Sequence, residues 1–325
     1  MASPNASQIA STTIESRTGM LADNVTKNNA LLKKLREKGK IKTVSGGRVI
    51  YQELEYAENS SFKRFSGLET LDTTQSQIIS AAEYNFAQAS VAVIMSGLER
   101  MQNHGKEATI NLLEAKISNA EKTLVNNIAR DCYSDGTADG GRQIGGLALL
   151  VPDDPTTGIA GGINRATAGN EFWRSFKYSA LTDGGAAADA ANIQDYMQTV
   201  LLNISRGTDM PDMIVTDNNY YKLFWQSMIA IQRVASDSKA TAGFSSLAFA
   251  NNIPVIYDGG IGGGATANHM WFLNTDYIFL RPSSIMNFEP TAQRQSVNQD
   301  ATIQYTLWGG NMTMSNASLQ GVLIA

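Results

Sequence analysis

The chain has 325 residues, of which 43% are hydrophobic, and its 26 basic and 30 acidic residues give a net charge of −4. This length suits about two domains with real cores, and the slight acidic excess disfavours strong binding to nucleic acid. Charged residues make up only 17% of the chain, against roughly 25% in ordinary soluble domains, so we expect part of the surface to be covered by other molecules.

The first 45 residues predict a polar arm with one amphipathic helix. Leu21, Val25, Leu32 and Leu35 recur near the helical repeat, and Gly39 is typical of a helix end. An arm with one apolar stripe needs a surface, which is either the body of its own chain or a neighbouring subunit. The start of the chain lacks the pattern of a signal peptide, and no apolar stretch reaches the roughly 18 to 20 residues that cross a bilayer. We therefore expect synthesis in the cytoplasm and no contact with a membrane.

Residues 46–83 predict an extended β-hairpin that turns at Glu58–Ser61. The charges divide between the two limbs, with Glu53 and Glu55 on the first and Lys63 and Arg64 on the second. A two-stranded ribbon with few apolar residues is only marginally stable alone. It is either a solvated hairpin whose charges keep it soluble, or a ribbon that lies on another surface chosen by those charges.

A strand at residues 89–95 is followed by a long predicted helix that starts near Lys106. Apolar residues recur there every three or four positions over roughly 26 residues, which corresponds to about 40 Å of helix. The apolar stripe consists of Leu113, Ile117, Ala120, Leu124, Ile128 and Cys132. Cys132 is the only cysteine, which excludes an intrachain disulfide and a cysteine zinc cluster. We expect it to be a small buried residue, and we expect the helix to end near Gly136.

Residues 138–284 alternate between helices and strands and predict a compact α/β domain. The predicted helices are Ala190–Ile204 and Tyr221–Met228, and the predicted strands are Met213–Thr216, Ile253–Tyr257, Met270–Leu273 and Tyr277–Leu280. Asp217 is expected to cap the second helix. The tail from Phe288 onward alternates like sheet again, at 301–307 and 318–324, and these strands need partners from elsewhere in the chain.

No catalytic, cofactor or metal site can be assembled from the sequence. His104 and His269 are the only histidines and lie far apart in the chain, so no local histidine pair is available for a metal. Residues Gly260–Ala265 formally match the dinucleotide fingerprint, but they lead into a predicted strand, whereas that motif requires a helix. We expect a tight loop at this position, no cofactor and no enzyme activity.

The order of these elements resembles the major capsid protein family of tailed bacteriophages, with its Hong Kong 97-type fold, over nearly the whole chain. The segments that carry the resemblance are 84–89 (YNFAQA), 96–99 (SGLE), 103–105 (NHG), 135–136 (DG), 144–147 (IGGL), 307–311 (LWGGN) and 321–323 (GVL). The resemblance implies an α+β fold with four parts. These are an N-terminal arm at 1–45, an extended loop at 46–83, a peripheral domain with the spine helix at 84–137 and 285–325, and an axial domain at 138–284.

The resemblance also implies a self-assembling shell that encloses a phage genome. Such a shell is built from pentamers and hexamers, and the expected partners are a separate scaffolding protein, a portal, decoration proteins and weakly, non-specifically contacted DNA. The candidate interface residues are Glu53, Glu55, Lys63 and Arg64 in the hairpin, with Gly260 and Gly262 in the glycine loop. The expected location is the virion capsid, after synthesis in the host cytoplasm.

Some members of this family join subunits by an isopeptide bond from a ribbon lysine to an asparagine. Lys63 is the only lysine of the ribbon here, but the bond needs a deprotonated amine beside a buried acid, which the sequence does not supply. Two other functions stay open. An encapsulin-like nanocompartment shell shares the fold and encloses enzymes, whereas an α/β enzyme or ligand-binding protein would use residues 138–284 as a monomer.

Overall fold

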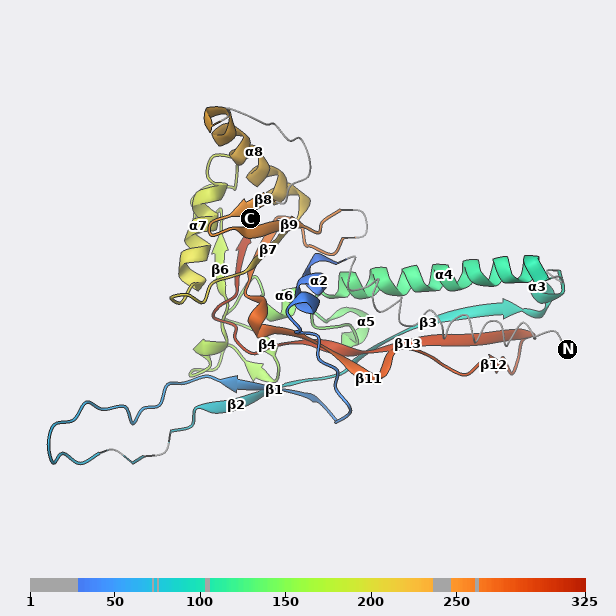
Figure 1. Ribbon diagram of the computed structural model, residues 1–325, viewed down its shortest axis with the longest axis horizontal. Coiled ribbons are helices and arrows are strands. Elements are labelled where there is room, and N and C mark those ends of the chain that lie inside the picture. Colours follow the sequence, from blue (N-terminus) through green and yellow to red (C-terminus); the bar gives the residue numbers. More distant parts are fainter. Residues whose placement is uncertain (1–28, 72, 75, 103–105, 236–246, 261–262) are drawn as a thin grey trace.

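The computed structural model describes residues 29–71, 73–74, 76–102, 106–235, 247–260 and 263–325. It has an α+β fold, as the sequence predicts, in which a sheet-and-helix unit, a long helix with a second sheet, and a projecting hairpin radiate from one centre (Figure 1). The expected arm residues Leu21 and Val25 lie outside the described residues.

The described part of the arm packs on its own chain. Helix α2 (Ala30–Glu37) buries three leucines completely, Leu31, Leu32 and Leu35. Gly39 follows it with a φ of +66°, a left-handed conformation that glycine adopts without steric cost. The chain then runs parallel to strand β11 (Ile278–Pro290), where the Lys42 amide donates to the carbonyl oxygen of Leu280 at 3.0 Å. This segment is therefore an extra edge of the sheet that contains β11.

The second sheet is antiparallel and carries the long helix. Strand β3 (Ala87–Ser96) pairs with β13 (Ala301–Met314), which also pairs with β11 and with β12 (Arg294–Gln295). Two helices follow β3, the short α3 (Gly97–Gln102) and the 26-residue α4 (Lys106–Asp131). Figure 1 shows α4 lying along β3 and β13 for most of their length.

Helix α4 has two different surroundings along its length. Its described apolar stripe is buried and consists of Ile117, Ala120, Leu124 and Ile128, followed by Cys132 just beyond the helix end. Ile117 and Ala120 pack on Val93 of β3, whereas the later residues enter the main core of the molecule. The predictions of a long helix and a buried cysteine are confirmed, and the Leu113 side chain lies outside the described residues.

The α/β unit is built on a six-stranded mixed sheet. In spatial order its strands are β6 (Phe176–Ser179), β14 (Gly321–Ile324), β10 (His269–Leu273), β7 (Met213–Thr216), β9 (Ile253–Tyr257) and β8 (Leu247–Phe249). Helices α7 (Ile193–Ile204) and α8 (Asn218–Ala235) pack on one face of it. Asp217 caps α8 as predicted, because its Oδ1 accepts a hydrogen bond from the Tyr220 amide at 3.1 Å.

Both faces of this sheet are buried, because successive side chains of a strand point to opposite faces. Ile214, Met270 and Leu323 join the core with α7 and α8. Their neighbours Met213, Trp271 and Val322 join the core that also holds α2 and the end of α4. The six-stranded sheet is thus the wall between two apolar cores.

The segment between α4 and β6 closes the second of these cores. It contains α5 (Ala138–Gly141), α6 (Leu147–Leu150), β4 (Ile159–Ala160), β5 (Ile163–Asn164) and a short 3-10 helix at Glu171–Trp173. Arg165 is 1% exposed, and its guanidinium donates to the carbonyl oxygens of Leu149, Leu150 and Trp173 at 3.0, 2.8 and 3.2 Å. No carboxylate of the described residues pairs with this buried cation, and three backbone acceptors hold it instead, which fixes the loop to α6.

The sequence groups residues 285–325 with the peripheral domain, and the strand pairing gives the last of these residues a second connection. Strand β14 lies between β6 and β10 in the six-stranded sheet, so the end of the chain returns to the α/β unit. The predicted domain boundary after residue 284 falls inside β11, where the pairing with β13 shifts register between Pro282 and Asn287. Alternating polarity identifies a strand and its buried face, but it does not identify the partner strand.

The burial of Ile128 in the main core predicts that truncating this side chain strongly lowers the free energy of unfolding. Ile128→Ala removes a side chain that is 1% exposed in the core shared by α4 and the sheet, and we expect a loss of about 2 to 5 kcal/mol in the free energy of unfolding. Chemical unfolding followed by circular dichroism measures it. Asn126→Ala, on the exposed face of the same helix, is the control, and equal losses for both variants would contradict the assignment.

Candidate assembly surfaces

The hairpin carries its acidic residues on one side. Strand β1 (Ile50–Glu55) pairs antiparallel with β2 (Ile79–Tyr84), with Glu53 opposite Ala81 and Glu55 opposite Ile79. Burial alternates strictly along β1, so Glu53 and Glu55 face solvent while Gln52 and Leu54 face the body. The structure thus places both predicted carboxylates on the outward face of the ribbon.

The chain turns near the predicted position, where the Phe62 amide donates to the carbonyl oxygen of Asn59 at 3.4 Å, but the hairpin does not reverse there and the predicted second limb is wrong. Residues 56–78 form a long connection between β1 and β2, and both Lys63 and Arg64 lie within it instead of opposite the two glutamates. The two sides of the connection come together a few residues beyond the strands, where the Ser60 amide donates to Ser76 Oγ at 3.2 Å. The second strand, ISAAEY, contains few large apolar residues, so its sequence gives only a weak strand signal.

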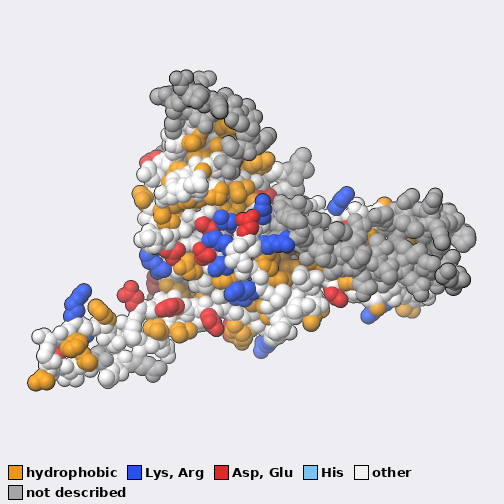
Figure 2. All heavy atoms as spheres, viewed as in Figure 1, with side chains coloured by type: hydrophobic (Ala, Val, Ile, Leu, Met, Phe, Trp, Pro, Cys, Tyr) orange, Lys and Arg blue, Asp and Glu red, His pale blue; other side chains and the backbone are white. Residues whose placement is uncertain are grey.

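The connection exposes apolar side chains at the far end of the hairpin. Four of them are more than half exposed, Phe62, Phe65, Leu68 and Leu71. Figure 2 shows hydrophobic side chains gathered at this end, away from the body. Clusters of exposed large apolar residues are typical of interaction surfaces, so this end is a candidate assembly surface.

The two predicted cations of this segment are already engaged within it. Lys63 Nζ lies 3.3 Å from Glu69 Oε2, and the guanidinium of Arg64 lies 5.6 Å from the centre of the Phe62 ring. Both side chains of the ion pair are about half exposed, so the acid beside Lys63 is not the buried acid that isopeptide chemistry needs. Both cations therefore make contacts within the connection itself.

The hairpin is fixed to the body by a polar cluster that sequence reasoning missed. Gln52 Oε1 accepts hydrogen bonds from the Arg281 guanidinium at 2.9 Å and from Thr313 Oγ1 at 3.1 Å. These residues come from β1, β11 and β13, which are far apart in sequence. No local pattern could have revealed the cluster, because only strand pairing brings the three side chains together.

The glycine loop leads into a strand, which contradicts a dinucleotide site and agrees with the predicted tight loop. Gly260 is described and has open space around it, whereas Gly262 lies outside the described residues. Gly264 packs against the end of α4, where an added Cβ would lie 2.6 Å from the Tyr133 ring. The same region is tied by the Tyr133 hydroxyl, which donates to Asp258 Oδ2 at 2.5 Å.

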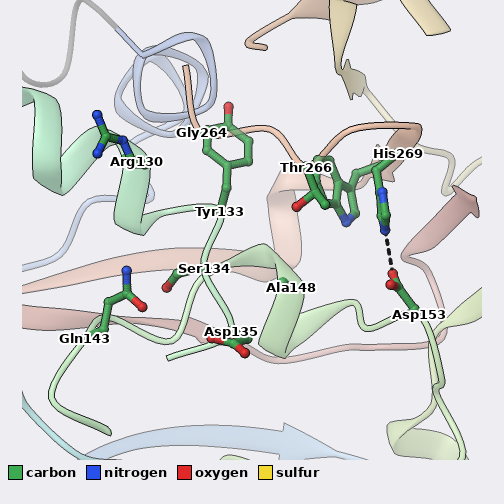
Figure 3. A pocket seen from close by; sticks show the side chains of 11 residues that line it. Arg130, Tyr133, Ser134, Asp135, Gln143, Ala148, Asp153, Gly264, Thr266 and His269 are labelled. Atoms are coloured by element: carbon green, nitrogen blue, oxygen red, sulfur yellow. Dashed lines mark hydrogen bonds and ion pairs between the residues drawn. The ribbon is translucent and has the colours of Figure 1, made fainter. Parts of the chain in front are cut away.

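A pocket of about 420 Å³ lies below this loop (Figure 3). It is lined by the end of α4, the segment after it, and the start of β10, including Arg130, Asp135 and Gln143. His269 and Asp153 meet across it, with His269 Nε2 at 2.8 Å from Asp153 Oδ1 and His269 Nδ1 at 2.7 Å from the carbonyl oxygen of Ala267. Both ring nitrogens thus face acceptors, an arrangement that suits the doubly protonated ring.

The charges of this pair follow from its surroundings. Burial lowers the pKa of His269, but the hydrogen bonds to Asp153 and Ala267 outweigh burial and raise that pKa above its ordinary value. The hydrogen bond from His269 holds the pKa of Asp153 below its ordinary value, against the opposing effect of burial. With both nitrogens engaged, His269 has no free nitrogen to act as a general base. Among the described residues, no three His, Cys, Asp or Glu side chains are grouped as a metal site.

The similarity of this chain to known proteins lies in its fold and not in its sequence. No protein-family model matches the sequence, and no curated protein gives a significant match. A chain of the capsid asymmetric unit of cyanophage A-1(L) is similar over 88% of this chain and 90% of its own length, with 14% identity and a TM-score of 0.63. The capsid of Myoviridae phage XM1 is similar over 90% and 91%, with 13% identity and a TM-score of 0.51.

The capsid of a native GTA particle is similar over 89% of both chains, with 12% identity and a TM-score of 0.53. The likeness extends over about nine tenths of the chain in all three cases. The chain therefore has the Hong Kong 97-type fold of tailed-phage capsid proteins, as its order of elements predicts. No helix among the described residues is both long enough and apolar enough to span a membrane.

The His269–Asp153 pair predicts a pH-dependent contribution to stability. The raised pKa of His269 means that its contribution is complete below about pH 6.5, the ordinary histidine value, and is lost as the pH rises through the raised value. The lowered pKa of Asp153 adds a second limit, because its contribution is lost as the pH falls through that lowered value. Since Asp153 is well exposed, we expect a coupling of about 1 kcal/mol at most.

A double-mutant cycle of His269→Gln and Asp153→Asn, followed by chemical unfolding from pH 5 to pH 9, measures this coupling. We expect the coupling energy to be largest at the acidic end of the range and to vanish at the alkaline end. A coupling that stays constant across the range would show that the pair does not titrate as the geometry requires.

Proposed function

We propose that this chain is the major capsid protein of a tailed bacteriophage, and that it self-assembles into the icosahedral head shell that encloses the genome. The observation that carries the proposal is the combination of a capsid fold over about nine tenths of the chain with a projecting hairpin whose apolar side chains at the far end are more than half exposed. A shell subunit needs such an extension, because each copy must bury part of its surface on the next.

In this proposal the hairpin and its connection lie on an adjacent copy. Burying one exposed Phe or Leu side chain contributes roughly 1.5 to 3 kcal/mol, and ordering the connection offsets part of that gain. Each contact is therefore weak alone. Contacts of one type that close into rings, with a second type that joins the rings, can enclose a volume because many weak contacts act together.

The finer assignments belong to the same proposal. The α/β unit, including β14, is the axial domain that meets its copies in pentamers and hexamers, and α4 with the β3–β13 sheet is the peripheral domain. A separate scaffolding protein, a portal and decoration proteins are its partners, and packaged DNA is contacted weakly because the net charge is −4. We assign no enzyme activity, since the pocket histidine is fully engaged.

Electron microscopy of the chain, expressed with the neighbouring gene products of its genome, tests the proposal. We expect closed hollow particles large enough for a phage genome. Particles too small for a genome that copurify with an enzyme would assign the chain to nanocompartment shells instead. A protein that remains monomeric at every salt concentration and with its assembly partner present would overturn the proposal.

The exposed end of the hairpin predicts an assembly defect without a folding defect. Leu68→Ser replaces a fully exposed apolar side chain, so we expect the free energy of unfolding to change by less than about 0.5 kcal/mol. The subunit concentration needed for shells should rise by roughly threefold to tenfold, because every copy loses the same contact. Light scattering measures that concentration.

Leu68→Met is the matched control, because it keeps an apolar side chain of similar volume. It should assemble like the parent chain. If Leu68→Ser assembles equally well, the end of the hairpin is not an assembly contact.

A further inference from the structure

The arm and strand β11 form a strongly basic surface on the same side of the molecule as the hairpin base. We name it the arm–β11 basic surface, and it consists of Lys34, Lys38, Lys40, Lys42 and Arg281. Figure 2 shows Lys and Arg side chains gathered over and around α2. This local excess of positive charge stands out in a chain whose net charge is −4.

Two carboxylates only partly neutralise this surface. Lys38 Nζ lies 3.0 Å from Asp212 Oδ2 and 2.8 Å from Asp276 Oδ2. Lys34 and Lys40 share the same two carboxylates at 3.7 and 3.4 Å. Three lysines therefore share two carboxylates, and Lys42 and Arg281 add two cations with no carboxylate partner among the described residues, so cations outnumber acids in this set.

The unmatched charge concentrates around Phe279. The cationic groups of Lys40, Lys42 and Arg281 lie 5.3, 5.6 and 5.0 Å from the centre of its ring. Within the described part of the chain, Lys42 and Arg281 have no carboxylate partner, and the buried Nε of Arg281 has no acceptor. The ring attracts each cation, but the three like charges repel one another, so an added carboxylate would relieve the repulsion.

The outward face of the hairpin has the opposite character. The pairing of β1 with β2 places Glu53, Glu55 and Glu83 on this face, together with the uncharged Tyr51, Ile79 and Ala81. None of the three glutamate side chains has a hydrogen bond or an ion pair within the described residues. By contrast, loop acids such as Asp135 and Asp154 are engaged by the threonines that follow them.

We propose that the arm–β11 basic surface receives the acidic outward face of the hairpin from a second copy of this chain. The proposal rests on the shell function above and names the partner surface of the hairpin. The alternation along β1 turns Glu53 and Glu55 away from their own body, so these carboxylates are available to another molecule. Three carboxylates on a ribbon without a cation match a surface whose cations lack carboxylates, and such complementarity selects the partner and the register of the contact.

A charge exchange between the two surfaces tests this inference. Lys42→Glu reverses an exposed cation that has no acidic partner of its own among the described residues, and circular dichroism and thermal unfolding confirm that the variant folds. We expect the subunit concentration needed for shells to rise by roughly threefold to tenfold at low salt. Lys42→Glu is then combined in turn with Glu53→Lys, Glu55→Lys and Glu83→Lys, and at least one double variant should return towards the parent value.

Lys222→Glu, an equal charge change on the exposed side of α8, is the matched control and should not be rescued by the same hairpin substitutions. The inference is overturned if Lys42→Glu assembles like the parent chain, or if no double variant assembles better than Lys42→Glu. A variant that forms normal shells but retains less nucleic acid would overturn it in favour of phosphate binding. Failure of the parent chain to form shells would instead sink the shell function, and this inference with it.

Discussion

The structure depends on one apolar core, which joins the C-terminal half of α4 to one face of the six-stranded sheet. Leu124 and Ile128 of the helix share this core with Val215 and Trp271 of the sheet. Backbone contacts close it further, because the Leu147 amide donates to the carbonyl oxygen of Cys132 at 2.8 Å. An added Cβ at Gly146 would lie 2.4 Å from that same oxygen, so α6 can lie this close to the helix end only because residue 146 is glycine.

The segments that extend from this core, α4 towards its start and the hairpin, bury fewer of their described side chains. Ile117 and Ala120 of α4 rest on β3 through a small cluster, and the hairpin is held at its base by Gln52 and the buried side of its strands. At the start of the connection, the Tyr56 ring still packs on Phe172 at 5.0 Å between ring centres, whereas Phe62, Phe65 and Leu68 further out are more than half exposed. An isolated ribbon with exposed aromatic residues gains little stability alone. The chain thus combines a well-buried centre with an exposed hairpin end, an arrangement that fits the proposed shell subunit.

Sequence reasoning recovered the features that depend on local periodicity and failed where distant strands decide. The spacing of Ile117, Leu124 and Ile128 predicted α4, and Asp217 predicted the start of α8. The pairing of β14 with β6 and β10 could not be predicted, because any exposed edge suits an alternating strand. Of the candidate interface residues, Glu53 and Glu55 lie together on one face, while Lys63 and Arg64 lie elsewhere, since the true turn is longer than a polar tetrapeptide suggested.

The sequence identity with capsid chains of the same fold is only 12 to 14%. The difference between what a buried core requires and what a contact surface requires explains this low value. A core accepts many combinations of apolar residues if burial pattern and volume are kept, so the centre of the molecule preserves a pattern and not particular residues. Surfaces that join copies of one chain only need to match each other. A cation at Lys42 and a carboxylate at Glu53 can exchange signs together without disturbing the core, because both side chains are exposed. In the proposed shell, the fold would determine where copies meet, and the paired charges of each sequence would determine which copies fit.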